Sequence, residues 1–146
     1  MHPSKIENFQ KGREIRAFPE FSSLSTEECA TLRQRLGSRL GWPNTDGLSL
    51  LHVLNLRATV IDAVNAEGPG FSLKRTLIEN GISPGRQWIY LNWYRLDEMD
   101  RMDFDDLNAN FGDIWYPGSD DLEIIDGELS WILFISHTGD VKVTCL

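Results

Sequence analysis

The side chains best suited to chemistry in this sequence are paired carboxylates beside aromatic rings. In the stretch DIWYPGSDD, residues 113–121, Asp120 and Asp121 follow Trp115 and Tyr116 across a proline–glycine turn. Adjacent carboxylates can bind a hard cation, serve as acid and base in a glycosidase, or present negative charge to another protein. These alternatives need different sequence surroundings.

A calcium loop and a glycosidase site both fit the sequence poorly. Residues 103–113, DFDDLNANFGD, alternate acids and amides, but a calcium loop needs glycine at its sixth position and glutamate at its twelfth. Counted from Asp103, these positions hold Asn108 and Ile114. A glycosidase generally needs a larger scaffold to build a sugar groove. We therefore expect no bound metal and no cofactor.

Motifs for nucleophilic catalysis and phosphate binding are missing. The sequence has no G-x-S-x-G elbow, no P-loop and no G-x-G-x-x-G stretch. None of the three histidines has a histidine or cysteine at metal-ligand spacing. His137 near Asp140 is a weak candidate for a catalytic pair, and a turn histidine is the simpler interpretation. We expect that the protein is not an enzyme.

Negative charge is concentrated in one segment. Residues 97–128 hold 12 of the 22 acidic residues and one basic residue, a net charge of −11, whereas the remaining residues sum to +3 and the whole chain to −8. Such a segment repels nucleic acid and anionic membranes and attracts a basic protein. We therefore expect a basic protein partner, no nucleic acid and no membrane.

The candidate binding residues are the acids of this segment and the aromatic residues interleaved with them. An aromatic side chain surrounded by acids has the composition of an interface hot spot for a cationic partner. The alternative is a solvated acidic face that keeps the protein in solution, with Trp115 in the core. The predicted protein-binding residues are Asp97, Glu98, Asp100, Asp103, Asp105, Asp106, Trp115, Tyr116, Asp120, Asp121 and Glu123.

Helices are predicted mainly in the first half of the chain. Ser25 and Glu28 form a capping box for a helix over residues 26–40, which Gly41 ends. Residues 48–65 favour one helix, although part of this apolar run could be a buried strand. Ser72 and Gly81 bound a further helix with Leu73, Leu77 and Ile78 inward. The first twenty residues form either a short helix or an extended arm.

Strands are predicted mainly in the second half. Alternating aromatic and branched residues indicate a strand over 86–96, a short strand over 121–126 and a hairpin over 129–146. A short helix over 102–112, capped by Asp103 and closed by Gly112, interrupts them. The pattern predicts an α+β fold over residues 1–146 as a single domain, with mainly N-terminal helices packed on a C-terminal antiparallel sheet of about four strands.

Length and composition place the chain among ordinary globular proteins. The 146 residues contain no apolar run long enough to span a bilayer and no leader-like start. We therefore expect a cytoplasmic protein, in which Cys29 and Cys145 are reduced thiols.

The C-terminal part resembles a class of small bacterial proteins. The stretches DIWYPGSDDLEIID and LSWILFISHTGDV are similar to the C-terminal signature of uncharacterised immunity-type proteins encoded beside toxins. The residues that carry this resemblance are Trp115, Pro117, Asp120, Asp121, Asp126, Trp131, His137 and Gly139. The resemblance implies a non-enzymatic protein that binds and neutralises a partner, such as a basic nuclease toxin, by occluding its active surface.

A small-molecule-binding domain or a small enzyme is the competing hypothesis. Its pocket would lie between the sheet and the helices, lined by Trp88, Tyr90, Trp93 and Tyr94. A deep cavity with converging polar groups that holds His137 or the pair Asp120 and Asp121 would favour this hypothesis, whereas a filled core with a flat acidic surface would favour protein binding.

Overall fold

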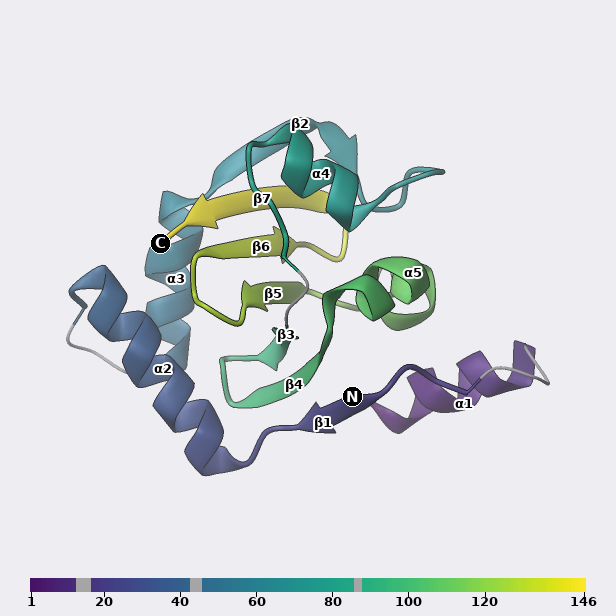
Figure 1. The fold of residues 1–146 in the computed structure, drawn as a ribbon, viewed down its shortest axis with the longest axis horizontal. Helices are drawn as coiled ribbons and strands as arrows, with labels where there is room; N and C mark the ends of the chain where they lie inside the picture. The colour runs from purple at the N-terminus through teal and green to yellow at the C-terminus, as the bar shows by residue number, and fades with distance from the viewer. Residues whose placement is uncertain (13–16, 43–45, 86–87) are drawn as a thin grey trace.

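The fold is built around one antiparallel sheet (Figure 1). The computed structural model describes residues 1–12, 17–42, 46–85 and 88–146 of the chain. The described helices are α1 (Pro3–Gly12), α2 (Thr26–Leu40), α3 (Gly47–Arg57), α4 (Leu73–Glu79) and α5 (Phe104–Ile114). The described strands are β1 (Phe21–Ser23), β2 (Thr59–Asn65), β3 (Trp88–Tyr94), β4 (Glu98–Asp103), β5 (Leu122–Asp126), β6 (Trp131–Ile135) and β7 (Asp140–Cys145).

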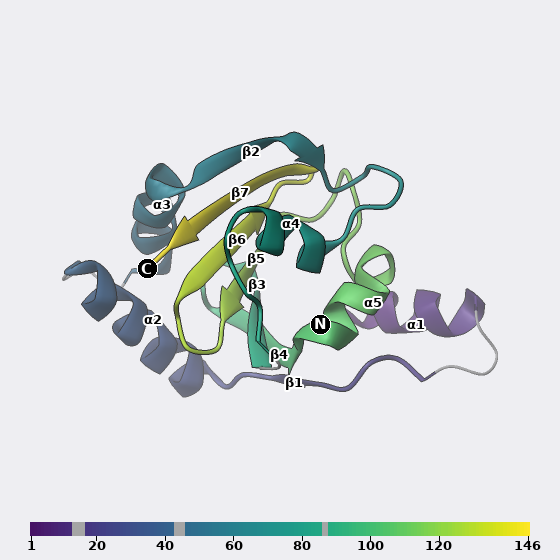
Figure 2. The same ribbon diagram turned by 45° about the horizontal axis from the view of Figure 1, so that its top comes forward.

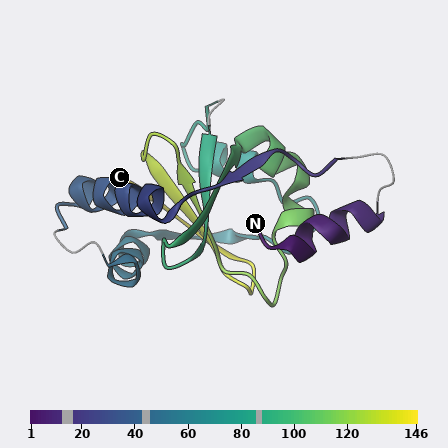
Figure 3. The same ribbon diagram turned by 90° about the horizontal axis from the view of Figure 1, so that it is seen from below.

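The sheet has seven strands in the order β1-β4-β3-β5-β6-β7-β2, so the prediction of about four strands was too low. The α+β class and the antiparallel pairing are confirmed. Both edge strands come from the N-terminal half, for which mainly helices were expected and a strand was left open only as a buried one within residues 48–65. Figure 3 shows how the chain crosses the sheet edge as β1 on its way from α1 to α2.

Helices cover both faces of this sheet. Leucines and aromatics of α4 and α5 share one core cluster with Ile89 and Leu91, and leucines of α2 and α3 share the other with Met99 and Ile132. Figure 2 shows α4 in front of the sheet and α2 and α3 together at one end of it. The interior between the layers is thus filled with side chains on both sides.

The helix starting after Ser25 is confirmed in full. The Ser25 side chain accepts from the Glu28 backbone N–H, the Glu28 carboxylate accepts from the Ser25 backbone N–H, and Gly41 ends the helix in the left-handed conformation. Helix α4 begins after Ser72 as predicted. Ile78, predicted to point inward, is 57% exposed.

Residues 48–65 do not form one helix. Helix α3 ends at Arg57, and residues 59–65 form edge strand β2, most of whose residues are exposed. The β-branched residues Thr59, Val60, Ile61 and Val64 favour a strand locally, while the preceding leucines favour a helix. The expected helix over 102–112 begins after Asp103, but it passes Gly112 and ends at Ile114. Positions 43–45 and 86–87, at the predicted turn and strand start, lie outside the described residues.

The two cysteines are free thiols in different surroundings. Cys29 is buried in α2, and burial raises the pKa of its thiol, while Cys145 is exposed at the end of β7. No helix in the described ranges has the length and apolar character needed to cross a bilayer.

Gly47 provides a stability test of the contact between α3 and the turn after β3. A Cβ at Gly47 would lie 1.7 Å from the Arg95 carbonyl oxygen, so the backbone must move to accommodate it. We expect Gly47→Ala to lower the free energy of unfolding by about 1–3 kcal/mol in urea denaturation followed by tryptophan fluorescence. Gly112→Ala, where no atom lies within 4 Å, is the control and should be neutral or slightly stabilising. Equal urea midpoints for the two variants would contradict this contact.

Candidate functional site

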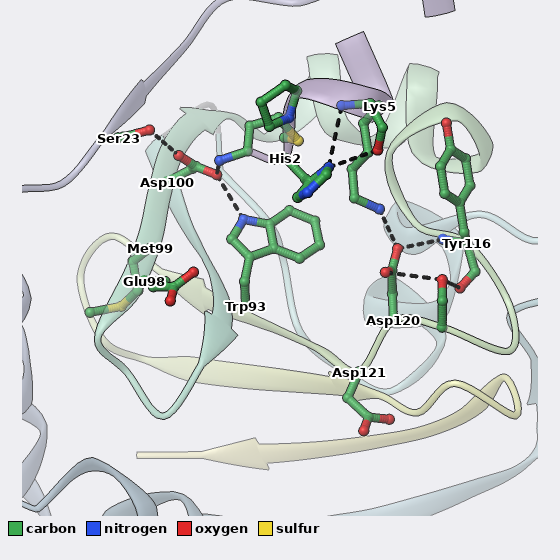
Figure 4. Close-up of a pocket in the computed structure, with 14 residues that line it drawn as sticks. His2, Lys5, Ser23, Trp93, Glu98, Met99, Asp100, Tyr116, Asp120 and Asp121 are labelled. Carbon is green, nitrogen blue, oxygen red and sulfur yellow. Dashed lines mark hydrogen bonds and ion pairs between the residues drawn. The ribbon is translucent and has the colours of Figure 1, made fainter. Parts of the chain in front are cut away.

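The largest concentration of predicted site residues lines a hollow of about 700 Å³ between α1, the β3–β4 hairpin and the loop that follows α5. We call it the Lys5 hollow (Figure 4). It brings together five of the eleven predicted residues, namely Glu98, Asp100, Tyr116, Asp120 and Asp121. The sequence did not indicate that α1 would line the hollow, because α1 is far from the other lining residues along the chain.

The ammonium group of Lys5 lies inside this hollow. It donates to the Ile114 carbonyl at 2.8 Å and pairs with Asp120, and its nitrogen lies 4.3 Å from the Tyr116 ring centroid and 5.1 Å from that of Trp93. Lys5 is only 4% exposed. Two aromatic faces and a carboxylate therefore stabilise a positive charge that is largely removed from water.

Asp100 forms the buried end of the hollow and is 1% exposed. Its carboxylate accepts from the Trp93 indole N–H at 2.7 Å and from the Ser23 hydroxyl at 2.6 Å, and it pairs with the α-amino group of Met1. These contacts tie β1, β3 and α1 together. Asp100 thus has a structural role at a position predicted to face a partner.

Asp120 organises the loop that closes the hollow. Besides its pair with Lys5, it accepts from the Tyr116 backbone N–H at 2.8 Å, and its own carbonyl accepts from the Trp115 indole N–H at 2.9 Å. The adjacent aromatic and acidic residues therefore stabilise one turn. This turn fixes the Tyr116 ring over the Lys5 ammonium.

Glu98 and Asp121 are the exposed acids of the hollow. The Glu98 side chain has no hydrogen-bond or ionic partner among the described residues, and the Asp121 side chain is 66% exposed. Asp121 accepts from the His137 backbone N–H at 2.8 Å and contacts the His137 ring at 3.0 Å, so Asp121 rather than Asp140 is the partner of this histidine. Figure 4 shows Asp121 at the rim, pointing away from the other residues.

The other predicted site residues lie elsewhere. Trp115 is 2% exposed and stacks on Phe111, so it belongs to the core and cannot present its ring to a partner. The remaining acids serve local contacts outside the hollow or lie on the surface: Asp97 pairs with Arg33, Asp103 caps α5, Asp105 pairs with Lys74 at 3.0 Å, Asp106 is exposed, and Glu123 lies beside α3.

Glu123 is the partly buried acid on the α2–α3 side of the sheet. It accepts a hydrogen bond of 2.5 Å from the Asn92 amide. Burial raises the pKa of the Glu123 carboxyl, an effect that the Asn92 hydrogen bond opposes and the charge of Asp121 reinforces.

The four aromatic residues of the competing hypothesis do not line one pocket, although the acid pair Asp120 and Asp121 does line the Lys5 hollow. Trp93 lines the Lys5 hollow and Tyr90 lines a separate hollow beside α2. Trp88 and Tyr94 are half exposed, with Arg101 and Arg95 over their rings. Within the described ranges no three histidine, cysteine or acidic side chains are placed to hold a metal ion.

Sequence reasoning missed Lys5, and it placed Trp93 only in the aromatic pocket of the competing hypothesis. The indole N–H of Trp93 is the feature that links it to an acid, Asp100. Lys5 carried no sequence signal, since its partners are more than a hundred residues away.

Comparisons with protein-family models, curated proteins and solved structures find no match to this chain. Its geometry is therefore the basis for assigning a function.

The Lys5–Asp120 pair should contribute strongly to stability. Removing one partner of a buried pair leaves an uncompensated charge, so we expect Lys5→Met to lower the free energy of unfolding by roughly 3 kcal/mol in urea. Adding Asp120→Asn should recover part of that loss. Lys74→Met is the control, because the Lys74 and Asp105 side chains are 47% and 50% exposed and their pair should contribute less than about 1 kcal/mol. Similar losses in both lysine variants would contradict a special role for Lys5.

Glu123 should make stability depend on pH. An acid whose pKa is higher in the folded than in the unfolded state lowers the free energy of unfolding as pH rises from the unfolded-state pKa to above the folded-state pKa. We therefore expect Glu123→Gln to raise the urea midpoint at pH 7, and this gain to vanish below the ordinary carboxyl value of 4.5. Glu98→Gln removes one charge at an exposed position and serves as the control. A gain that stays constant down to pH 3 would refute the effect of burial.

Proposed function

We propose that this chain is a non-enzymatic protein-binding module that takes a cationic segment of a basic protein at the Lys5 hollow. The observation that carries the proposal is the pair of exposed carboxylates, Glu98 and Asp121, at the edge of this hollow. The inner groups already hold a cation, because the Lys5 ammonium lies against Trp93 and Tyr116 and pairs with Asp120. A partner's lysine or arginine would thus pair with the two exposed acids rather than with the rings.

The charge of the chain supports a basic partner. The net charge is −8, and residues 97–128, which include β4, α5 and β5, carry −11. Several acids are neutralised within the fold, but the excess still attracts a cationic macromolecule at a distance. Electrostatic attraction raises the association rate more than it raises affinity.

The resemblance of the C-terminal part to immunity-type proteins supports a toxin as that partner. Toxins that attack nucleic acids carry basic surfaces because they bind phosphate groups. An acidic module can present carboxylates where the phosphates would lie and so occlude the active surface.

A titration with a defined cationic probe tests this proposal. A fluorescently labelled lysine–serine peptide should bind the full chain, and its affinity should fall as salt rises, whereas a glutamine–serine peptide should not bind. Replacing Glu98 by Gln and Asp121 by Asn should slow association about tenfold at low salt in stopped-flow measurements.

The matched control is Asp105→Asn with Asp106→Asn, which removes two charges from α5 outside the hollow. A smaller effect of this pair would support the hollow as the contact site. Equal effects of both pairs would indicate that the overall negative charge, and not the hollow, determines the association rate. Absence of salt-sensitive binding would overturn the proposal.

A further inference from the structure

Helix α3 has an outer face that is apolar and yet exposed to water. Its eleven residues, GLSLLHVLNLR, are apolar on nearly every side. Leu50 and Leu54 are fully buried against the sheet, but Leu48 is 55% and Leu56 73% exposed. A helix that is apolar all round is normally covered on all sides. The outer face of α3 is therefore a candidate interaction surface.

The exposed leucines border a shallow groove of about 380 Å³ between α3 and the sheet. Leu48, His52 and Leu56 follow one another at intervals of four residues and so form one stripe along the helix. We call the hollow lined by Leu48, Leu51, His52, Asn55, Leu56, Glu123 and Phe134 the α3 groove. Val60, 50% exposed at the start of β2, extends the apolar surface beyond α3.

A single carboxylate lies in this apolar groove. Glu123 faces α3 from β5, next to Phe134 of β6, and its described hydrogen bond comes from Asn92. Burial raises the pKa of this carboxyl, since water solvates it poorly there. The Lys142 ammonium nearby donates to Asn55 at 3.0 Å. A cation entering the groove would give the Glu123 carboxylate a charge partner, which none of the described residues provides.

We propose that the α3 groove binds an amphipathic helix of a partner protein, whose apolar face covers Leu48 and Leu56 and whose lysine or arginine reaches Glu123. The charge of the chain selects this occupant over a second copy of itself. Two copies would each bring a net charge of −8 and the same acid to the interface, whereas a cationic helix complements both.

This surface lies apart from the Lys5 hollow. Glu123 and Phe134 lie on the sheet face covered by α2 and α3, whereas Trp93 packs with the α4–α5 cluster on the other face. The inference therefore goes beyond the function proposed for the hollow and can fail independently of it.

A pair of peptides tests the proposal. The first is a labelled amphipathic helical peptide with leucines along one face and one lysine among them, and the second carries norleucine in place of that lysine. Fluorescence anisotropy should show that Leu48→Ser with Leu56→Ser weakens binding of the lysine peptide at least tenfold. Ile78→Ser, which removes an equally exposed apolar side chain from α4, is the control and should leave the affinity unchanged.

The cation contact has its own readout. Glu123→Gln should weaken the lysine peptide about fivefold and leave the norleucine peptide unaffected, because only the lysine pairs with the carboxylate. The hollow variant with Glu98→Gln and Asp121→Asn should still bind the norleucine peptide as the unmodified chain does, which separates this site from the hollow.

Two results would overturn the proposal. One is peptide binding that does not respond to Leu48 and Leu56, or no peptide binding at all. The other is a dimer of the unmodified chain in sedimentation that the two serine substitutions dissociate, since the groove would then be occupied by a second copy.

Discussion

The fold depends on a sheet whose central strands are apolar on both faces. In β5 the neighbouring residues Ile124 and Ile125 are both fully buried although they point to opposite sides, and in β6 the same holds for Ile132 and Leu133. Such strands must be covered on both sides. The helices are therefore divided, with α2 and α3 on one face and α4 and α5 on the other. Their positions in turn determine which acids become buried and which stay exposed.

Covering a sheet that also carries acids requires compensating charges. Asp100 lies on β4, where side chains alternate between the two faces, and it is buried as deeply as the apolar residues around it. The fold supplies hydrogen bonds from Trp93 and Ser23, and the α1 segment supplies positive charge at Asp100 and Asp120. The first residues of the chain are thereby attached to the sheet by ionic contacts in addition to the packing of Phe9 on Phe18.

Patterns confined to a few neighbouring residues allowed parts of this structure to be predicted. The capping box of Ser25 and Glu28 and the Asp103 cap are local, so the starts of α2 and α5 could be predicted from sequence. The C-terminal hairpin joins neighbouring segments and was predicted for the same reason. Strand β4 was missed because its sequence, EMDRMD, places acids on both faces, and the burial of Asp100 depends on Met1 and Ser23, which lie far away in the chain. The Lys5 hollow depends on such distant contacts as well, so sequence identified some of its acids but not its shape.

Some acids are used in contacts within the fold and others lie at the Lys5 hollow and the α3 groove. The two proposed surfaces would therefore contribute differently to binding. Clustering in the sequence does not produce a single negative face, because Asp97, Asp103 and Asp105 each stabilise a separate helix or contact. What remains is a long-range field together with acids at two separate hollows. A field that falls off slowly accelerates encounter with any cationic protein, whereas the residence time of a complex depends on apolar contacts that exclude water. The Lys5 hollow is suited to the first task, since its acids Glu98 and Asp121 are exposed. The leucines of α3 are suited to the second, because a helix that covered them would also remove Glu123 from water and strengthen its attraction to a cation.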